Sequence, residues 1–395
     1  MSKTFGTLKE VREKLLGYRF ESVVRLAPIA YERLAAIEAG KEAPSFLELD
    51  RLARLYGLDM DAMCGDPIAL TPGDGVEVLT RLEEFRDVDD ITRSRIVAAA
   101  NAAKDLISLN ARTGTEDLRT SFQRERPRLS LKSGGALAYQ QGAELARQTR
   151  SHLGIGNKPI ASLRDLVADE FPSLTILHAD LGTNGPAGLG FVDRLRGPVI
   201  VLNSRGKNEN PCVRRFSLAH ELCHMLIDWN GQEPLATISG YFNERDLERE
   251  RRANAFAVRF LCPPPVLQRI DPNDERQSRK VLRDYGIPYA AWRLYVRNVR
   301  NLEMPKQSPS TWGQLGDTVW ADAEEPLGVA SFPLTEVPTE RRTRIAELAA
   351  RLYSAGDLAR DEFAEMLGVS PASELERVLD YFAFDPPDEN HHNVA

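Results

Sequence analysis

Three titratable side chains interrupt an otherwise apolar helical segment, FSLAHELCHMLI, at residues 216–227. His220, Glu221 and His224 lie among core-like apolar residues, and burying such groups without partners is costly. The two histidines are four residues apart, so on a helix their imidazoles lie on one face, one turn apart. Imidazoles at this spacing can hold one zinc ion at about 2.0–2.1 Å each. The segment therefore predicts a metal-binding helix.

Glu221 follows directly after the first histidine and projects roughly 100° around the helix from it. From that position it can take a proton from the attacking water as a general base. The pattern His-Glu-X-X-His is typical of zinc peptidases. In the alternative interpretation, the two histidines are core residues bonded to backbone carbonyls, and Glu221 lies at the surface.

A zinc peptidase needs a third protein ligand and leaves one position open for water. The segment LERERRANAFAVRFL, residues 247–261, offers a helical stripe made of Glu250, Ala253, Asn254, Ala257 and Leu261. Small alanines let another helix approach closely, and a metal would explain the acid on that stripe. Glu250 is therefore the predicted third ligand, with a surface ion pair as the alternative. Asn254 either orients a ligand or forms a packing contact, and Glu248, about 200° away from Glu250, should be solvated.

The segments RRFSLAHELCH and ERRANAFAVRFLCPP resemble the motifs of the ImmA/IrrE family of metallopeptidases. The likeness extends over residues 136–305. Members of this family are typically zinc-dependent endopeptidases that cleave helix-turn-helix repressors. The resemblance implies a zincin-like, gluzincin-type domain with ligands His220, His224 and Glu250 and with Glu221 as the base. Zinc is the expected ion, although these ligands also suit other divalent metals.

Two further expectations concern the surroundings of this site. Cys223 stands where the family usually has glycine, and we expect it to be an inert core residue. Tyr241 and His178 are weak candidates for stabilising an oxyanion. The run PVIVLN, residues 198–203, is expected to be an edge strand with which an extended peptide could pair.

Residues 1–68 consist of short helical segments separated by Gly, Pro or Ser. Within them, IEAGKEAPSFLELDRLARLYGLDMDAM resembles the Cro/C1-type (XRE) helix-turn-helix family, in which residues 30–37 would form the recognition helix. The resemblance implies a five-helix DNA-binding domain. Tyr31, Glu32 and Arg33 offer few amide groups for reading adenine edges. Binding of DNA and a role in protein contacts or dimerisation therefore both stay open.

The predicted architecture is α+β and mostly helical. β-Rich runs such as LTILHA and GLGFVD supply a small sheet. The predicted domains are a helix-turn-helix domain at 1–68, a helical connector at 69–135, the peptidase domain at 136–305, a linker at 306–335, and a C-terminal helical unit with a disordered tail at 336–395.

Composition narrows the class of protein further. The 395 residues are 42% hydrophobic and 28% charged, as in soluble globular proteins. The net charge of −7 argues against a protein that binds nucleic acid over its whole surface. No apolar run approaches the roughly 18 residues that span a bilayer, and the charged N-terminus is unlike a signal peptide. Four scattered cysteines indicate reduced thiols. We therefore expect a cytoplasmic protein.

Two classes of function follow. The first is a cytosolic, zinc-dependent, site-specific endopeptidase that cleaves a helix-turn-helix transcriptional repressor. The second is a DNA-binding regulator whose metal domain senses a ligand or partner without proteolysis. The expected partners are a protein substrate, DNA through residues 1–68, and a second copy of the chain as a homodimer; no membrane is expected.

Overall fold

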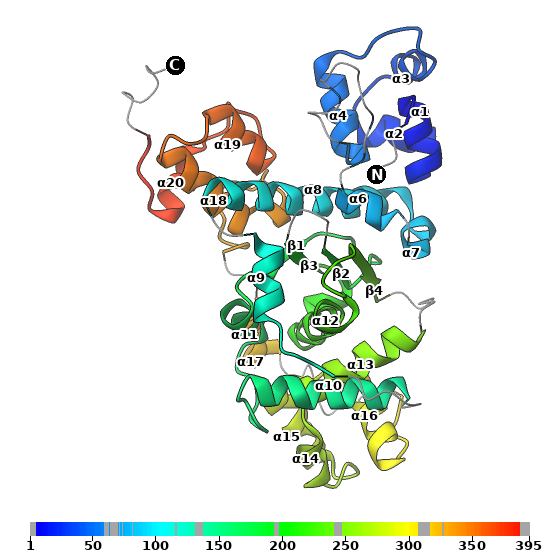
Figure 1. The fold of residues 1–395 in the computed structure, drawn as a ribbon, viewed down its shortest axis with the longest axis vertical. Coiled ribbons are helices and arrows are strands. Elements are labelled where there is room, and N and C mark those ends of the chain that lie inside the picture. Colours follow the sequence, from blue (N-terminus) through cyan, green and yellow to red (C-terminus); the bar gives the residue numbers. More distant parts are fainter. Residues whose placement is uncertain are drawn as a thin grey trace. The chain divides into compact units, whose positions relative to one another are not determined.

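The computed structural model describes residues 5–58, 63, 70, 72, 74–80, 82–114, 117–130, 137–192, 197–240, 247–306, 317–325 and 328–387. Two compact units divide the chain: one contains Met1–Asp117, Leu177–Gly182 and Pro326–Ala395, and the other contains Leu118–Ile176 and Thr183–Glu325. Helices dominate and one small sheet is present (Figure 1), so the predicted α+β, mostly helical fold is confirmed. The domain boundaries stay predictions. Among the described residues, no helix combines the length and apolar character needed to cross a bilayer.

The first unit is organised around the long helix α8 (Asp90–Arg112). Asp89 caps this helix, because its side chain accepts hydrogen bonds from the backbone N–H groups of Ile91 and Thr92. The helices that pack against α8 include α2 (Phe20–Leu26), α4 (Phe46–Tyr56), α6 (Asp74–Leu79) and α18 (Arg344–Ser354). The other helices of this unit are α1 (Leu8–Glu10), η1 (Val11–Leu16), α3 (Tyr31–Glu38), α7 (Glu83–Asp87), η5 (Thr339–Arg341), α19 (Arg360–Leu367) and α20 (Glu376–Phe382).

The C-terminal helices α18 to α20 therefore belong to the same unit as the N-terminal helices. Arg341, at the end of η5, forms an ion pair of 2.7 Å with Asp105 on α8. The side of α18 that contacts α8 and α19 is apolar and fully buried, including Ile345, Leu348 and Ala349. Burial of these apolar side chains stabilises the packing of the C-terminal helices in this unit. Most of residues 59–65, where a fifth N-terminal helix was expected, and the tail from residue 388 lie outside the described residues.

The sheet contains β1 (Thr175–Ala179), β2 (Gly188–Val192), β3 (Pro198–Asn203) and β4 (Leu235–Ser239) in the order β1-β3-β2-β4. β2 pairs antiparallel with both β3 and β4, and Gly190 lies opposite Ile200 on one side and Thr237 on the other. The expectation that PVIVLN is an edge strand is wrong, because β3 has a neighbour on each side. Its unbroken apolar run is buried throughout, as is typical of a central strand.

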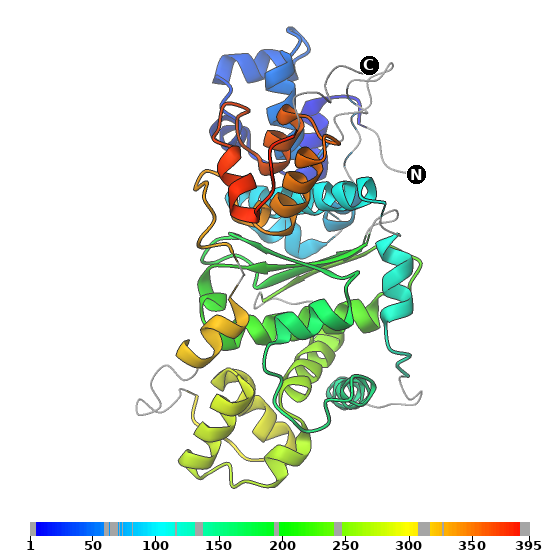
Figure 2. The same ribbon diagram turned by 90° about the vertical axis from the view of Figure 1, so that its left-hand side faces the viewer.

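The helices of the second unit are α9 (Leu118–Glu125), α10 (Ala138–His152), α11 (Leu163–Glu170), η2 (Gly206–Glu209), α12 (Pro211–Cys223), η3 (His224–Asp228), α13 (Leu247–Leu261), α14 (Pro264–Gln268), α15 (Glu275–Tyr285), α16 (Tyr289–Arg300) and α17 (Asp317–Glu324). α12 lies along one face of the sheet, α13 packs on α12, and α10 packs on α13 (Figure 2). Gly142 permits the last contact, since a Cβ there would collide with the backbone of Arg252.

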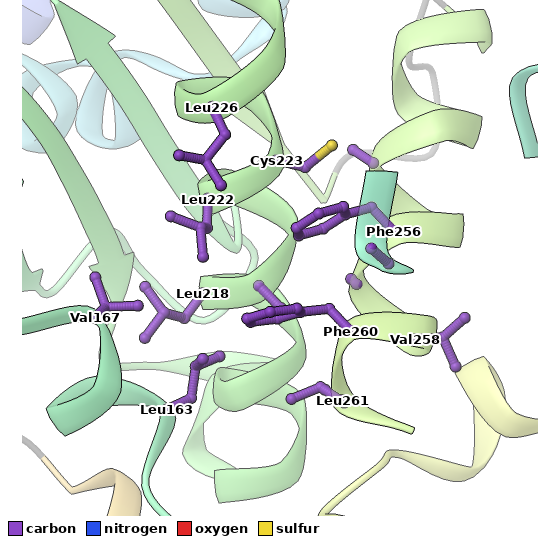
Figure 3. Close-up of a cluster of buried hydrophobic side chains, with 14 of the residues drawn as sticks. Leu163, Val167, Leu218, Leu222, Cys223, Leu226, Phe256, Val258, Phe260 and Leu261 are labelled. Atoms are coloured by element: carbon purple, nitrogen blue, oxygen red, sulfur yellow. The ribbon is translucent and has the colours of Figure 1, made fainter. Parts of the chain in front are cut away.

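The core of this unit holds α12, which carries His220, in place. Leu218 and Leu222 on α12 face Leu163 and Val167 on α11, and Phe256 and Phe260 project from α13 (Figure 3). The two phenyl rings stack with centroids 5.2 Å apart. Each fully buried side chain of this size contributes about 1.5–3 kcal/mol relative to exposure. The same apolar periodicity that predicts α12 therefore fixes its rotation, and with it the direction of the histidines.

Part of the predicted linker is a packed helix in the structure. α17 contacts α12, and Arg215 on α12 forms a fully buried ion pair with Glu324. The guanidinium of Arg215 also lies 4.3 Å from the ring centroid of Trp320. Glu324 in turn accepts a 2.7 Å hydrogen bond from the backbone of Leu163, at the start of α11. α17 thus ties α12 to α11 at the end of α12 that precedes the histidines.

Candidate metal centre and active site

The structure brings the three predicted ligands together. His220 Nε2 and His224 Nε2 are 3.1 Å apart. Glu250 on α13 places Oε2 3.0 Å from His220 Nε2 and Oε1 3.3 Å from His224 Nε2. Both histidines are buried and Glu250 is nearly so. Three potential ligand atoms therefore converge on one point between two helices.

These distances fit a tetrahedral metal ion. Bonds of about 2.0–2.1 Å at tetrahedral angles would separate neighbouring ligand atoms by roughly 3.3–3.4 Å. The three separations of 3.0, 3.1 and 3.3 Å are close to this value. Two imidazoles and one carboxylate also form a donor set that suits zinc and several other divalent metals. The residues thus fit a site with three protein ligands.

The electrostatics of these three residues favour a bound cation. Burial opposes the charged form of Glu250, yet the two imidazoles hold the pKa of its carboxyl well below the usual range. Burial also opposes protonation of His224, but hydrogen bonds to Asp228 and Glu250 raise the pKa of this imidazole to about 10. A metal ion binds the neutral imidazole, so protons and metal ions compete for His224 Nε2.

Each histidine is oriented by a side chain at its other ring nitrogen. His224 Nδ1 lies 2.6 Å from Asp228 Oδ2, and His220 Nδ1 lies 3.2 Å from Asn254 Oδ1. An Nδ1–H that donates to these oxygens leaves the lone pair of Nε2 for the metal. Asp228 is itself held by an ion pair with Arg252. The sequence left the role of Asn254 open and did not identify Asp228, although its position four residues after His224 was a visible signal.

We expect the substitution Asp228→Asn to weaken zinc binding by about 10–100-fold, the range typical of removing such an outer partner. A neutral amide accepts the Nδ1–H hydrogen bond less strongly and cannot make the ion pair with Arg252. Competition with a chromophoric chelator measures the affinity. The matched control is Asp169→Asn, at an exposed position on α11, which should leave the affinity unchanged. Equal affinities for both variants would contradict the role given to Asp228.

Glu221 is fully buried beside the sheet. Its Oε2 accepts a 3.0 Å hydrogen bond from Thr237 Oγ1 on β4, while Oε1 has no hydrogen-bond partner among the described residues. Two glycines on β2 make room for this carboxylate. A Cβ at Gly188 would lie 2.8 Å from Oε1, and one at Gly190 would lie 3.2 Å from Oε2. One oxygen is thus anchored and the other keeps its lone pairs for a proton.

The glycine pair gives a second prediction. We expect Gly188→Ala to lower the rate of peptide cleavage by at least about ten-fold, since a shift of the base by a fraction of an ångström disturbs a positioned proton transfer. The three atoms nearest to the new Cβ all belong to Glu221, so zinc affinity should change little. A rate equal to that of the parent would show that the carboxylate can move without consequence.

The three remaining candidates from the sequence are Tyr241, His178 and Cys223. Tyr241 lies outside the described residues. His178 lies in β1 and is buried, in the segment grouped with the first unit. Cys223 is fully buried beside Phe256 (Figure 3), and burial raises the pKa of its thiol well above the ordinary value. A neutral, enclosed thiol is consistent with the expected core residue.

Comparison with known protein families agrees with this geometry. Residues 171–294 match the family model described as Peptidase_M78, IrrE N-terminal-like domain. This range contains both helices of the site, and the match supports a metallopeptidase of the ImmA/IrrE type. A peptidase family implies a protein substrate, and zinc is its typical metal. No curated protein and no solved structure matches the chain.

Proposed function

We propose that this protein is a cytosolic, zinc-dependent, site-specific endopeptidase that cleaves a helix-turn-helix transcriptional repressor. The convergence of His220, His224 and Glu250 next to the half-anchored carboxylate of Glu221 carries the proposal. The match of residues 171–294 to a peptidase family supports it. The repressor is inferred from the resemblance to the ImmA/IrrE family, whose members typically cleave such proteins.

In this mechanism the chain positions its substrate, the metal and a base. His220, His224 and Glu250 would hold a divalent metal ion, which would supply Lewis acidity toward the scissile carbonyl and toward water. Glu221 Oε1 takes the proton of the attacking water and then gives it to the leaving amine. Thr237 holds the other oxygen of Glu221 in place. Because β4 is an edge strand and carries Thr237, an extended substrate can pair with β4 beside the base.

The alternative function, a DNA-binding regulator without proteolysis, has less support. α3 covers most of the expected recognition helix, and its one arginine, Arg33, pairs with Glu42 and Glu48. Glu32 on the same helix is exposed and would repel phosphates. A charge-neutralised helix is better suited to protein contacts than to a phosphate backbone. We therefore assign residues 1–68 to recognition of a protein partner within the proposed function.

The test is to incubate zinc-loaded protein with purified helix-turn-helix repressors encoded in the same genome. One repressor should be cut at a single bond, identified by mass spectrometry of the fragments, and a chelator should stop the reaction. A gel-shift assay with the DNA upstream of the protein's own coding sequence should show no specific complex. A specific shift without cleavage of any repressor would favour the regulator instead.

A further inference from the structure

A pocket of about 440 Å³ lies in the second unit, on the side of η3 occupied by Leu226 and Ile227. It falls in the range of small-molecule sites, which is about 300–1,000 Å³. The pocket is lined by Gln123, Arg126, Pro127, Arg128, Leu129, Leu145, Leu226, Ile227, Trp229 and Asn230. None of the proposed metal ligands or the base belongs to this lining, so the pocket is a separate site.

The cations in the lining have no acidic partner there. Arg126 is half-buried, donates a 2.7 Å hydrogen bond to the carbonyl of Trp229, and forms no ion pair with any described residue. Burial lowers the pKa of its guanidinium, and no carboxylate offsets this effect. Arg128 is exposed and likewise forms no ion pair within the described part of the chain. In a protein with more acids than bases, two unpaired arginines at one pocket indicate a preference for an anion.

Other lining residues are apolar. Leu145 and Leu226 are buried, while Leu129 and Ile227 are half-buried. The guanidinium of Arg126 lies 5.0 Å from the centroid of the Trp229 ring, which helps to hold the cation in place. A half-buried guanidinium held by a backbone carbonyl and an aromatic face loses little further freedom when it binds an anion.

We propose that this pocket binds a small molecule that carries one carboxylate or phosphoryl group on an apolar chain. The anionic group pairs with Arg126 and Arg128, and the chain lies against Leu129, Leu145 and Ile227. An anion alone would leave the apolar side chains uncovered, and a neutral apolar molecule would leave the Arg126 guanidinium without an anionic partner. The lining therefore selects for both properties in one ligand.

The pocket lies against the helical turn that precedes Asp228, the residue that orients one proposed metal ligand. Ile227 precedes Asp228, and Asp228 forms the hydrogen bond that orients His224. A ligand against Ile227 thus contacts the same turn of π-helix that holds the outer partner of the metal ligand. The inference concerns binding alone and does not depend on the proposed proteolysis.

Isothermal titration calorimetry of the full chain tests the proposal with four probes: octanoate, octyl phosphate, octanol and inorganic phosphate. We expect octanoate or octyl phosphate to bind one molecule per chain, and the comparison of the two distinguishes a carboxylate ligand from a phosphoryl ligand. Octanol and inorganic phosphate should each bind at least about ten-fold more weakly, because octanol lacks the anionic group and inorganic phosphate lacks the apolar chain. Binding of octanol as tight as that of both anions, or binding of neither anion, would overturn the proposal.

Three variants locate the site. Arg126→Gln should weaken binding of the anionic probe by about ten-fold or more, because a charge-assisted hydrogen bond is lost. The matched control is Arg119→Gln: Arg119 lies 5.7 Å from the same Trp229 ring but does not line the pocket, so affinity should be unchanged. Arg128→Gln is at an exposed position and should fold even if loss of the Arg126 hydrogen bond disturbs the structure. Two results together would refute the assignment. Arg128→Gln would have to bind the anionic probe as tightly as the parent, and Arg126→Gln would have to do the same or fail to fold.

Discussion

Replacing Glu221 with Gln is expected to lower the rate of substrate cleavage by about 10²–10⁴-fold, the usual contribution of a general base. The amide has the shape of the carboxylate and can still accept the hydrogen bond from Thr237 Oγ1. It cannot take up a proton from water. The three proposed ligands are not altered, so the variant should hold as much zinc as the parent, measured by elemental analysis.

The matched control for this substitution is Glu248→Gln. Glu248 is an exposed acid on α13, two residues before Glu250 in the chain, and its removal changes the net charge by the same amount. Its kcat/KM and zinc content should equal those of the parent. If Glu221→Gln cleaved the substrate as fast as Glu248→Gln, another group would have to be the base. If Glu221→Gln lost zinc, the lower cleavage rate would instead be explained by damage to the metal site.

The residues proposed to bind the metal were predictable because helical periodicity decides their geometry. The spacing of His220 and His224 places both rings on one face of any helix. The stripe that contains Glu250 also contains Ala253 and Ala257, and both alanines are fully buried in the structure. When the small residues of a helical stripe face a neighbouring helix, the remaining residues of that stripe face the same helix. The local pattern therefore sufficed to predict that these three side chains meet.

The surroundings of Glu221 were not predictable in the same way, because they depend on contacts between strands. Thr237 reaches the base only through the pairing of β4 with β2. The five residues of β4 are too few for a clear alternation of apolar and polar residues. Gly188 and Gly190 are visible in the run GLGFVD, but only the packing of α12 on β2 shows what they accommodate.

The position of β3 and the packing of α17 also depend on tertiary structure. An apolar run such as PVIVLN is compatible with any place in a buried sheet, and the pairing partners decide whether it is an edge. The segment around α17 is short and lies in a polar stretch. It is held by Trp320 and by the buried pair of Arg215 and Glu324, whose partners are more than one hundred residues apart. A contact between residues so far apart in the chain cannot be predicted from the periodicity of a local segment.

Replacing Glu250 with Gln is expected to weaken zinc binding by more than about 100-fold, since the loss of a ligand should exceed the 10–100-fold effect of losing an outer partner. The neutral amide is a poor ligand for a divalent cation, and only two imidazoles would be left to hold the metal. Zinc at about 100 times the dissociation constant stabilises the parent by about 2.7 kcal/mol. We therefore expect zinc to raise the thermal midpoint of the parent measurably and that of Glu250→Gln hardly at all.

Glu248→Gln is again the matched control, because it removes one acid from the same turn of α13 at an exposed position. Its zinc affinity and its zinc-dependent rise in thermal midpoint should match those of the parent. Equal zinc responses in Glu250→Gln and Glu248→Gln would mean that the carboxylate between the two imidazoles is a structural ion pair. In that case the 3.3 Å contact between Glu250 and His224 would be explained by a protonated His224, whose pKa the same carboxylate helps to raise, and the site would lack its third ligand.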